Sequence, residues 1–251
     1  MKYISIALLA FLLLSCKNEA DTKSLSAADI VNKSIAVSGG KHFESSMIKF
    51  IFRDKSYVAK RLKGETAMVR MFMDKSDTIT DFLSNSEYKR LVGQVYAKVA
   101  DSMVKKYSAS VNSVHYFSVL PYGLNDNSVN KTLLEDEQIK GVDYYKVKVT
   151  FNEDGGGEDY EDVFVYWIDK QLFKLDYLAY SYSENDEVGM RFREAYNERY
   201  VSGLRFVDYN NYKSEDTSSQ LLDLGKAFKN NQLQLLSKIE LENVIVNLID
   251  N

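Results

Sequence analysis

Six carboxylates within ten positions, from Glu153 to Asp162, are the first residues that could do chemistry. Ca²⁺ needs hard oxygen ligands on a flexible turn, and three glycines interrupt this segment. The candidate ligands are Asp154, Glu158, Asp159 and Asp162. Their spacing does not follow the EF-hand order, in which ligands alternate up to a terminal Glu. We therefore favour a solvated loop between two strands and expect no metal site, with Ca²⁺ binding as the alternative.

A group of arginines near position 200 is the second candidate. Arg191 and Arg193 share one face if their segment is a strand, and Arg205 could meet them across a turn at residues 197–198. Such a cluster can hold a phosphate or carboxylate head group. We favour the alternative, cross-strand ion pairing, which contributes little when exposed. The other residues that such pairing would involve are Arg199, Asp176, Glu194, Glu198 and Asp208.

A histidine near a serine is the third candidate, because acyl transfer uses this pair. His115 follows Ser113 by two positions, but no G-x-S-x-G motif occurs in the chain and no second histidine lies nearby in sequence. We therefore interpret His115 as a helix residue hydrogen-bonded within the core. With 2 His and 1 Cys, a thiolate enzyme or a His/Cys zinc site is close to excluded.

Composition narrows the function further. The net charge is -4 and no run of Lys or Arg occurs, so nucleic acid is not an expected partner. The chain has 18 Tyr and 13 Phe but 1 Pro, a balance that suits long strands with one wet face.

The N-terminus has the pattern of a bacterial lipoprotein signal. Lys2 precedes a run from Ile4 to Leu14 that is apolar apart from Ser5 and is too short to span a bilayer. The run ends in Leu-Leu-Ser-Cys at residues 13–16, which resembles a lipobox and contains the only cysteine. We expect a signal peptide at residues 1–15, lipidation of Cys16, a flexible tether at 16–25 and one folded domain at 26–251.

Strand-like runs dominate this domain. Apolar residues alternate with polar ones from Tyr144 to Phe151. The segment from Val163 to Ile168 is instead apolar at odd and even positions alike, so we expect this strand to be covered on both faces. Short polar breaks separate the runs, which predicts consecutive antiparallel strands. Further hairpins are expected over residues 47–62, 66–83 and 88–99, with strands at 131–134 and 236–248.

Three segments have helical patterns. The first begins with the capping-box spacing Ser26 to Asp29 and stops at Gly39. The second extends over residues 101–119 and ends before Pro121. The third is short, over residues 220–230. Ten to twelve strands in one sheet must curl or close, so the fold class is α+β and mostly antiparallel β, a curled sheet or half-barrel with helices packed in its concave face.

This order of elements resembles, at the level of fold, the Lol-type lipoprotein carriers, whose incomplete barrel holds acyl chains. The chain is also similar to an uncharacterised family of lipoproteins from Bacteroidota. The segments that carry the second resemblance are SIAVSGG, NSVHYFSVLPYGLND, GGGEDYEDVFVYWI, LDYLAYSYSENDEVGMRFREAYN, GLRFVDYNNY and LLSKIELENV, between residues 34 and 244. That family implies no established active site.

These observations favour a lipoprotein anchored in the cell envelope. We expect it in the outer membrane, on the periplasmic or the surface face. We expect it to bind a lipid or acyl chain, without catalysis and without a cofactor. The alternative is an accessory subunit of an envelope complex with no ligand of its own. A dry pocket is expected between the middle helix and the sheet, and the methionines, among them Met68 and Met190, argue against a rigid filling. The expected ligand-binding residues are Tyr107, Val111, Tyr116, Phe117, Trp167, Tyr180, Arg191, Phe192 and Arg193.

Overall fold

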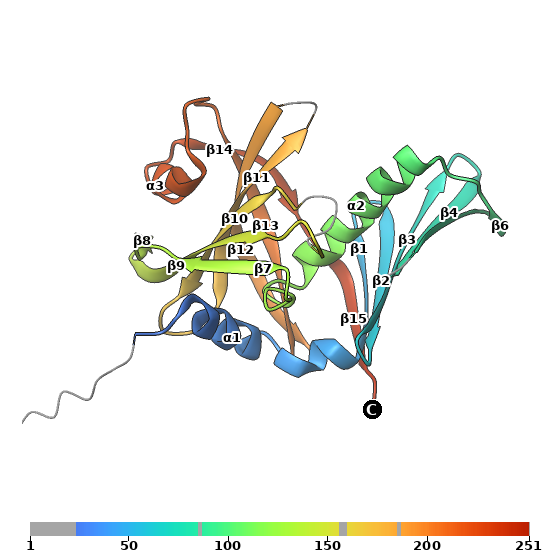
Figure 1. The fold of residues 1–251 in the computed structure, drawn as a ribbon, viewed down its shortest axis with the longest axis horizontal. Coiled ribbons are helices and arrows are strands. Elements are labelled where there is room, and N and C mark those ends of the chain that lie inside the picture. The colour runs from blue at the N-terminus through green and yellow to red at the C-terminus, as the bar shows by residue number, and fades with distance from the viewer. Residues whose placement is uncertain (1–23, 85–86, 156–159, 185–186, 251) are drawn as a thin grey trace, which may run out of the picture.

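Residues 24–84, 87–155, 160–184 and 187–250 are described by the structure, a computed structural model. The strands in this part of the chain form two open antiparallel sheets (Figure 1). No helix within these residues is both long and apolar enough to cross a membrane. The predicted class, mostly antiparallel β with few helices, is confirmed.

The first sheet contains the N-terminal hairpins. Its strands, in chain order, are β1 (Ser46–Phe52), β2 (Lys55–Leu62), β3 (Glu65–Asp74), β4 (Asp77–Ser84), β5 (Tyr88–Val92) and β6 (Val95–Tyr96), with β15 (Glu242–Leu248) paired to β1. The strand expected up to residue 99 is only the two-residue β6.

The second sheet contains the long aromatic strands. Its strands are β7 (Val129–Leu133), β8 (Glu137–Ile139), β9 (Val142–Phe151), β10 (Val163–Asp169), β11 (Leu175–Glu184), β12 (Glu187–Val201), β13 (Leu204–Ser214) and β14 (Leu233–Ile239). β14 and β7 lie at its two edges, and β8 pairs with β9.

The chain end joins the two sheets, where the sequence suggested one sheet and one last strand. β14 pairs with β13, and after a break at residues 240–241 β15 pairs with β1. The side chains of Asp208 and Arg199 bind the backbone at this break. Leu241 N donates to Asp208 Oδ1 at 2.9 Å, and Arg199 Nη2 donates to the Leu241 carbonyl at 2.6 Å. These polar contacts take the place of ladder hydrogen bonds, so the segment bends from one sheet into the other.

The N-terminal helix α1 (Ala27–Val37) begins as predicted. The Ser26 hydroxyl accepts from Asp29 N at 3.1 Å, and the Asp29 carboxylate accepts from Ser26 N at 3.0 Å, which completes the capping box. Buried Ile30 and Val31 pack in a core with strands of the second sheet. The 3-10 helix η1 (Gly40–Ser45) then leads into β1.

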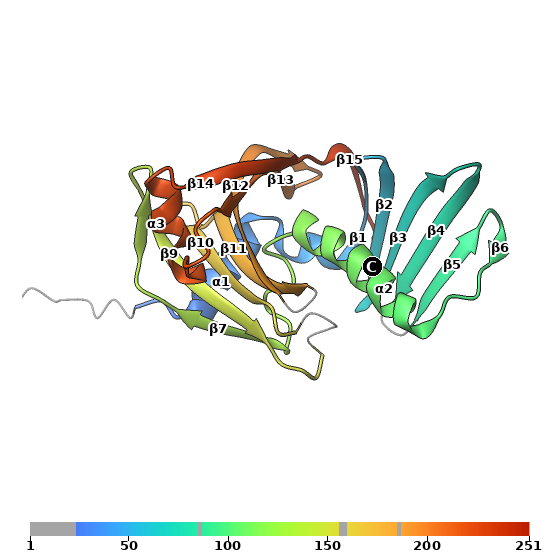
Figure 2. The same cartoon turned by 90° about the horizontal axis from the view of Figure 1, so that it is seen from above.

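The middle helix α2 (Asp101–Ser118) runs between the two sheets (Figure 2). Its contacts with strands are chiefly to β3 and β4 of the first sheet. Its C-terminal turn reaches the second sheet, where the Tyr116 and Tyr166 hydroxyls lie 2.8 Å apart. The helix therefore forms one wall of the space that the two open sheets leave between them.

The strand β10 is covered on both faces, as its composition predicted. Phe164, Tyr166 and Ile168 belong to the core that contains α1. Val165 and Trp167 belong to a separate core with the short helix α3 (Leu224–Lys229), which follows η2 (Leu221–Asp223). We call the first of these the inner face and the second the outer face.

Candidate functional site

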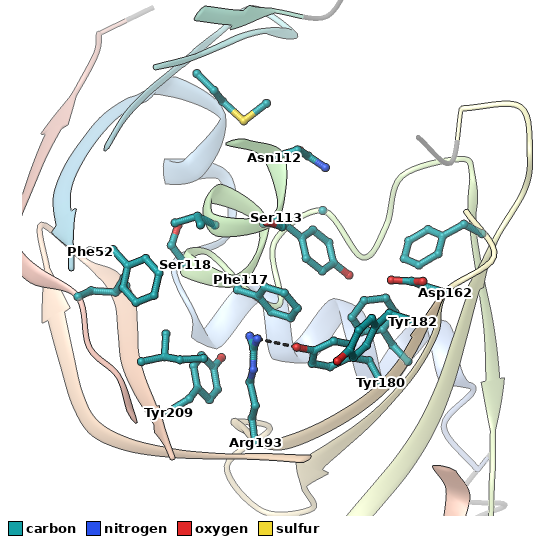
Figure 3. A pocket seen from close by; sticks show the side chains of 18 of the residues that line it. Phe52, Asn112, Ser113, Phe117, Ser118, Asp162, Tyr180, Tyr182, Arg193 and Tyr209 are labelled. Atoms are coloured by element: carbon teal, nitrogen blue, oxygen red, sulfur yellow. Dashed lines mark hydrogen bonds between the residues drawn. The ribbon is translucent and has the colours of Figure 1, made fainter. Parts of the chain in front are cut away.

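A cavity of about 830 Å³ lies between α2 and the inner face of the second sheet (Figure 3). Its size is in the range of small-molecule sites. Most of its larger lining side chains are apolar or aromatic. They are Phe52, Met68, Leu83, Val114, Tyr116, Phe117, Val129, Phe151, Phe164, Tyr180, Tyr182, Val207, Tyr209, Ile239 and Leu241.

Stacked rings form the wall on the second sheet. Phe164 and Tyr180 face each other across β10 and β11 with centroids 5.4 Å apart. Phe117 of α2 lies 5.4 Å from the Tyr180 ring, and Tyr116 lies 5.9 Å from Phe164. Apolar rings from a helix and two strands therefore converge on the space, and they can bury the chain of a hydrophobic ligand.

Arg193 is the charged residue of this wall. Its side chain is 7 % exposed, and its Cζ lies 3.8 Å from the centroid of Phe117. Nη2 donates to the Tyr180 hydroxyl at 2.8 Å, whereas the buried Nε has no hydrogen-bond partner within the described residues. Burial lowers the pKa of this guanidinium, and the nearby Tyr180 and Tyr209 oppose that shift.

Four of the nine residues expected to bind ligand line this cavity: Tyr116, Phe117, Tyr180 and Arg193. Tyr107 and Val111 lie on α2 but do not line it. The Tyr107 ring stacks under Arg90, whose Cζ is 3.7 Å from its centroid, and Val111 is fully buried. Both lie nearer the helix start, where α2 packs against the first sheet.

Trp167 and Phe192 were expected to line the cavity, but the structure places both of them outside it. Both belong to the outer-face core with Phe228 of α3, and their centroids lie 5.5 Å apart. Side chains alternate along a strand, so Trp167 points away from the face that carries Tyr166. Because the side chains on both faces of β10 are apolar, hydrophobicity alone did not indicate which face borders the cavity.

The three arginines do not come together in one cluster. Arg191 shares a face with Arg193 but stacks over Tyr182 and does not line the cavity. Arg205 does not meet either of them, because the turn between β12 and β13 is at residues 202–203 and Arg205 pairs with Tyr200. It forms ion pairs with Glu198 and Asp176, which is the alternative pairing proposed from the sequence.

His115 is a core residue, as interpreted from the sequence. It is 1 % exposed and packs edge-on against the stacked rings of Phe50 and Tyr57, and Nε2 is 3.4 Å from the Val69 carbonyl oxygen. Burial is the main cause that lowers its pKa to about 3, and the charges of Arg61 and Arg70 add to it. A neutral, enclosed imidazole of this kind is not placed to act on a ligand.

Only part of the acidic segment can be located. Glu158 and Asp159 lie outside the described residues. Asp154 is exposed, and Asp162 lines the cavity together with Gly155. Within the described ranges no group of three or more His, Cys, Asp or Glu side chains is arranged to hold a metal ion. Cys16, the expected lipidation site, also lies outside the described residues.

Several lining residues were missed from the sequence, chief among them Phe164, Val207 and Tyr209. A signal for Phe164 was present, since it alternates with Tyr166 and Ile168. The sequence pattern does not reveal which residues of β10 and β11 pair, and this register is what sets Phe164 opposite Tyr180. Of the methionines expected to keep the space adaptable, Met68 lines the cavity, whereas Met190 packs against the outer-face core.

The chain belongs to a family of unknown function, DUF6503, whose profile matches residues 2–241. No protein with a curated description matches it in sequence.

Among solved structures, the chain is similar to a LolA superfamily protein from Nitrosomonas europaea, with a TM-score of 0.51 and 10% identity over 91% of this chain and 95% of that one. It also aligns with a putative outer membrane lipoprotein-sorting protein domain from Vibrio parahaemolyticus, with a TM-score of 0.43 and 10% identity over 80% and 97% of the two chains. The first similarity shows a shared fold, the open LolA-like half-barrel.

Proposed function

We propose that this protein is a lipoprotein of the bacterial cell envelope that binds a lipid or an acyl chain in the cavity between α2 and the second sheet, without catalysis. The observation that carries the proposal is the cavity of about 830 Å³ with its largely apolar and aromatic lining. An alkyl chain gains about 0.8 kcal/mol for each CH₂ group that it buries, so a long chain can offset the cost of ordering it.

The shared fold supports the same proposal. The similar structures include a LolA superfamily protein and a domain described as lipoprotein-sorting. Anchoring through Cys16 is supported by the lipobox-like Leu-Leu-Ser-Cys at residues 13–16. The resemblance to Bacteroidota lipoproteins agrees with an outer-membrane location, on the periplasmic or the surface face.

Titration of an uncharged fluorescent alkyl probe into lipid-free protein tests this function. Probe fluorescence must be followed, because Trp167 lies on the outer face and its emission does not report on the cavity. We expect saturable binding in the micromolar range. Ser113 lines the cavity from α2, so Ser113→Trp should weaken binding at least tenfold.

Ser102→Trp is the matched control, since Ser102 is exposed near the start of the same helix and does not line the cavity. It should leave the affinity unchanged. If no alkyl probe binds saturably, or both variants behave alike, the proposed binding function is wrong.

The second candidate, an accessory subunit of an envelope complex, is favoured by one observation. The β5–β6 hairpin at the free edge of the first sheet exposes Val95 by 72% and Tyr96 by 69%. An edge strand with exposed apolar side chains can pair with another protein. Absence of any alkyl binding, together with a complex that Val95→Lys dissociates, would favour this candidate.

A further inference from the structure

Arg193 carries a positive charge into a wall made largely of aromatic and apolar side chains. It lies in β12, one residue beyond the outer-face Phe192, so its side chain enters the cavity. Figure 3 shows its guanidinium below Phe117, with the hydroxyls of Tyr180 and Tyr209 on either side.

Two of the other buried arginines of the sheets, Arg70 and Arg205, have a carboxylate partner, whereas Arg61 forms no ion pair within the described residues. Arg70 Nη2 lies 2.6 Å from Asp81, and Arg205 Nη2 lies 3.3 Å from Asp176. Within the described residues no carboxylate forms an ion pair with Arg193, and its Nε has no hydrogen-bond partner. A buried charge is costly unless an opposite charge or hydrogen bonds compensate it. In Arg193 that compensation is incomplete.

The phenols beside Arg193 have protons to donate. The Tyr180 hydroxyl accepts from Arg193 Nη2, so its own O–H remains available. Tyr209 is 3 % exposed, lines the cavity and forms no side-chain hydrogen bond within the described residues. Burial raises the pKa of Tyr209 to about 12, so its hydroxyl keeps its proton at neutral pH. One guanidinium and two O–H donors therefore lie on the same wall of the cavity.

We propose that Arg193, Tyr180 and Tyr209 bind the oxyanion of an anionic amphiphile, a carboxylate or a phosphate, whose alkyl chain lies against the apolar side chains of the cavity. This inference rests on the proposed function and adds a head-group class to it. Donors of this kind suit an oxyanion, because hydrogen bonds to a charged acceptor are shorter and stronger than neutral ones.

The test compares ligands that differ in one group. The uncharged alkyl probe is displaced from lipid-free protein at about pH 8 by palmitate, hexadecyl phosphate, hexadecanol, acetate or inorganic phosphate. We expect palmitate or hexadecyl phosphate to compete at least about tenfold better than hexadecanol, the ratio that one charge-assisted hydrogen bond gives. Whichever of the two competes better identifies the head group. Acetate and inorganic phosphate, which lack a chain, should not compete.

Variants assign the preference to Arg193. Arg193→Met should lose the preference for the anions over hexadecanol, and Arg193→Lys should keep part of it. Tyr209→Phe should reduce the preference. Arg61→Met is the control, because Arg61 is equally buried but lies at a different pocket beside Tyr122. It should keep the full preference.

The possible failures are distinct. Equal competition by palmitate, hexadecyl phosphate and hexadecanol, or an anion preference that survives Arg193→Met, overturns the head-group assignment and leaves the proposed function standing. Competition by the chainless anions as strong as by palmitate would also overturn it, since the ligand would not be an amphiphile. If the probe itself does not bind, the proposed function fails first.

Discussion

Phe117 of α2 lies over the guanidinium of Arg193 of β12, with 3.8 Å between the Arg193 Cζ and the ring centroid. This contact joins the helix to the second sheet at the middle of the cavity wall. The ring and the Tyr180 hydroxyl stabilise the charge only in part, because an ion pair is absent within the described residues. The cavity and the incompletely compensated charge therefore occur at one place.

Two arginines of nearly equal burial should respond in opposite ways to removal of their charge. Arg193→Met should leave the free energy of unfolding unchanged or raise it by about 1–2 kcal/mol, because an apolar side chain replaces an unpaired buried charge. Arg70→Met should lower it by about 1.5–3 kcal/mol, because Asp81 then loses charged hydrogen bonds and keeps those from Arg90 and Tyr88. Urea unfolding followed by circular dichroism measures both. A loss of more than about 1 kcal/mol in Arg193→Met would mean that the guanidinium has a structural role.

His115 should make stability depend on pH on the acid side of neutrality. Its pKa is about 3 in the folded protein, against an ordinary value of 6.5. Between these two pH values the imidazole binds a proton in the unfolded chain but not in the folded protein. This contribution to stability is fully present above pH 6.5 and is lost as the pH falls toward 3, by up to about 1.4 kcal/mol per pH unit.

Urea midpoints at pH 7 and at pH 4.5 check this dependence, with His115→Gln as the comparison. The groups that face the imidazole are the rings of Phe50 and Tyr57, the Val69 carbonyl and, through their charges, Arg61 and Arg70. Gln cannot take up the proton, so the variant should lose less stability on acidification than the wild type. Parallel losses in the two proteins would exclude His115 as the cause.

Cys16→Ser should release the protein from the membrane without unfolding it. Acyl chains on this residue would supply about 0.8 kcal/mol for each buried CH₂ group, and residue 16 precedes the first helix of the folded part. Membrane fractionation and the thermal midpoint of the released protein are the two measurements. A variant that stays in the membrane fraction as firmly as wild type would place the anchor elsewhere.

Calcium should not stabilise the protein selectively through the acidic segment from residue 153 to 162. We expect Ca²⁺ to shift the thermal midpoint no more than Mg²⁺ does at the same ionic strength, because a solvated loop only screens its charges. A rise at sub-millimolar Ca²⁺ that disappears in Asp159→Asn plus Asp162→Asn would instead support the metal site.

The sequence by itself determined the features that depend on neighbours along the chain. The Ser26–Asp29 capping box, the helix before Pro121 and the hairpins of the first sheet follow from local patterns. Alternation also showed that Arg191 and Arg193 share a face, and the apolar composition of Val163 to Ile168 showed that both faces of that strand are covered.

Only the tertiary structure decided which face borders the cavity. Tyr166 and Trp167 are equally suited to burial, and the choice between them depends on α3 packing on one side and α1 and α2 on the other. The tertiary structure also decided the partners of the charged residues. Arg205 pairs with Glu198 and Asp176 because of the register of β12 and β13, whereas Arg193 contacts aromatic side chains instead. Contacts between residues far apart in sequence set these outcomes, and a local pattern carries no information about them.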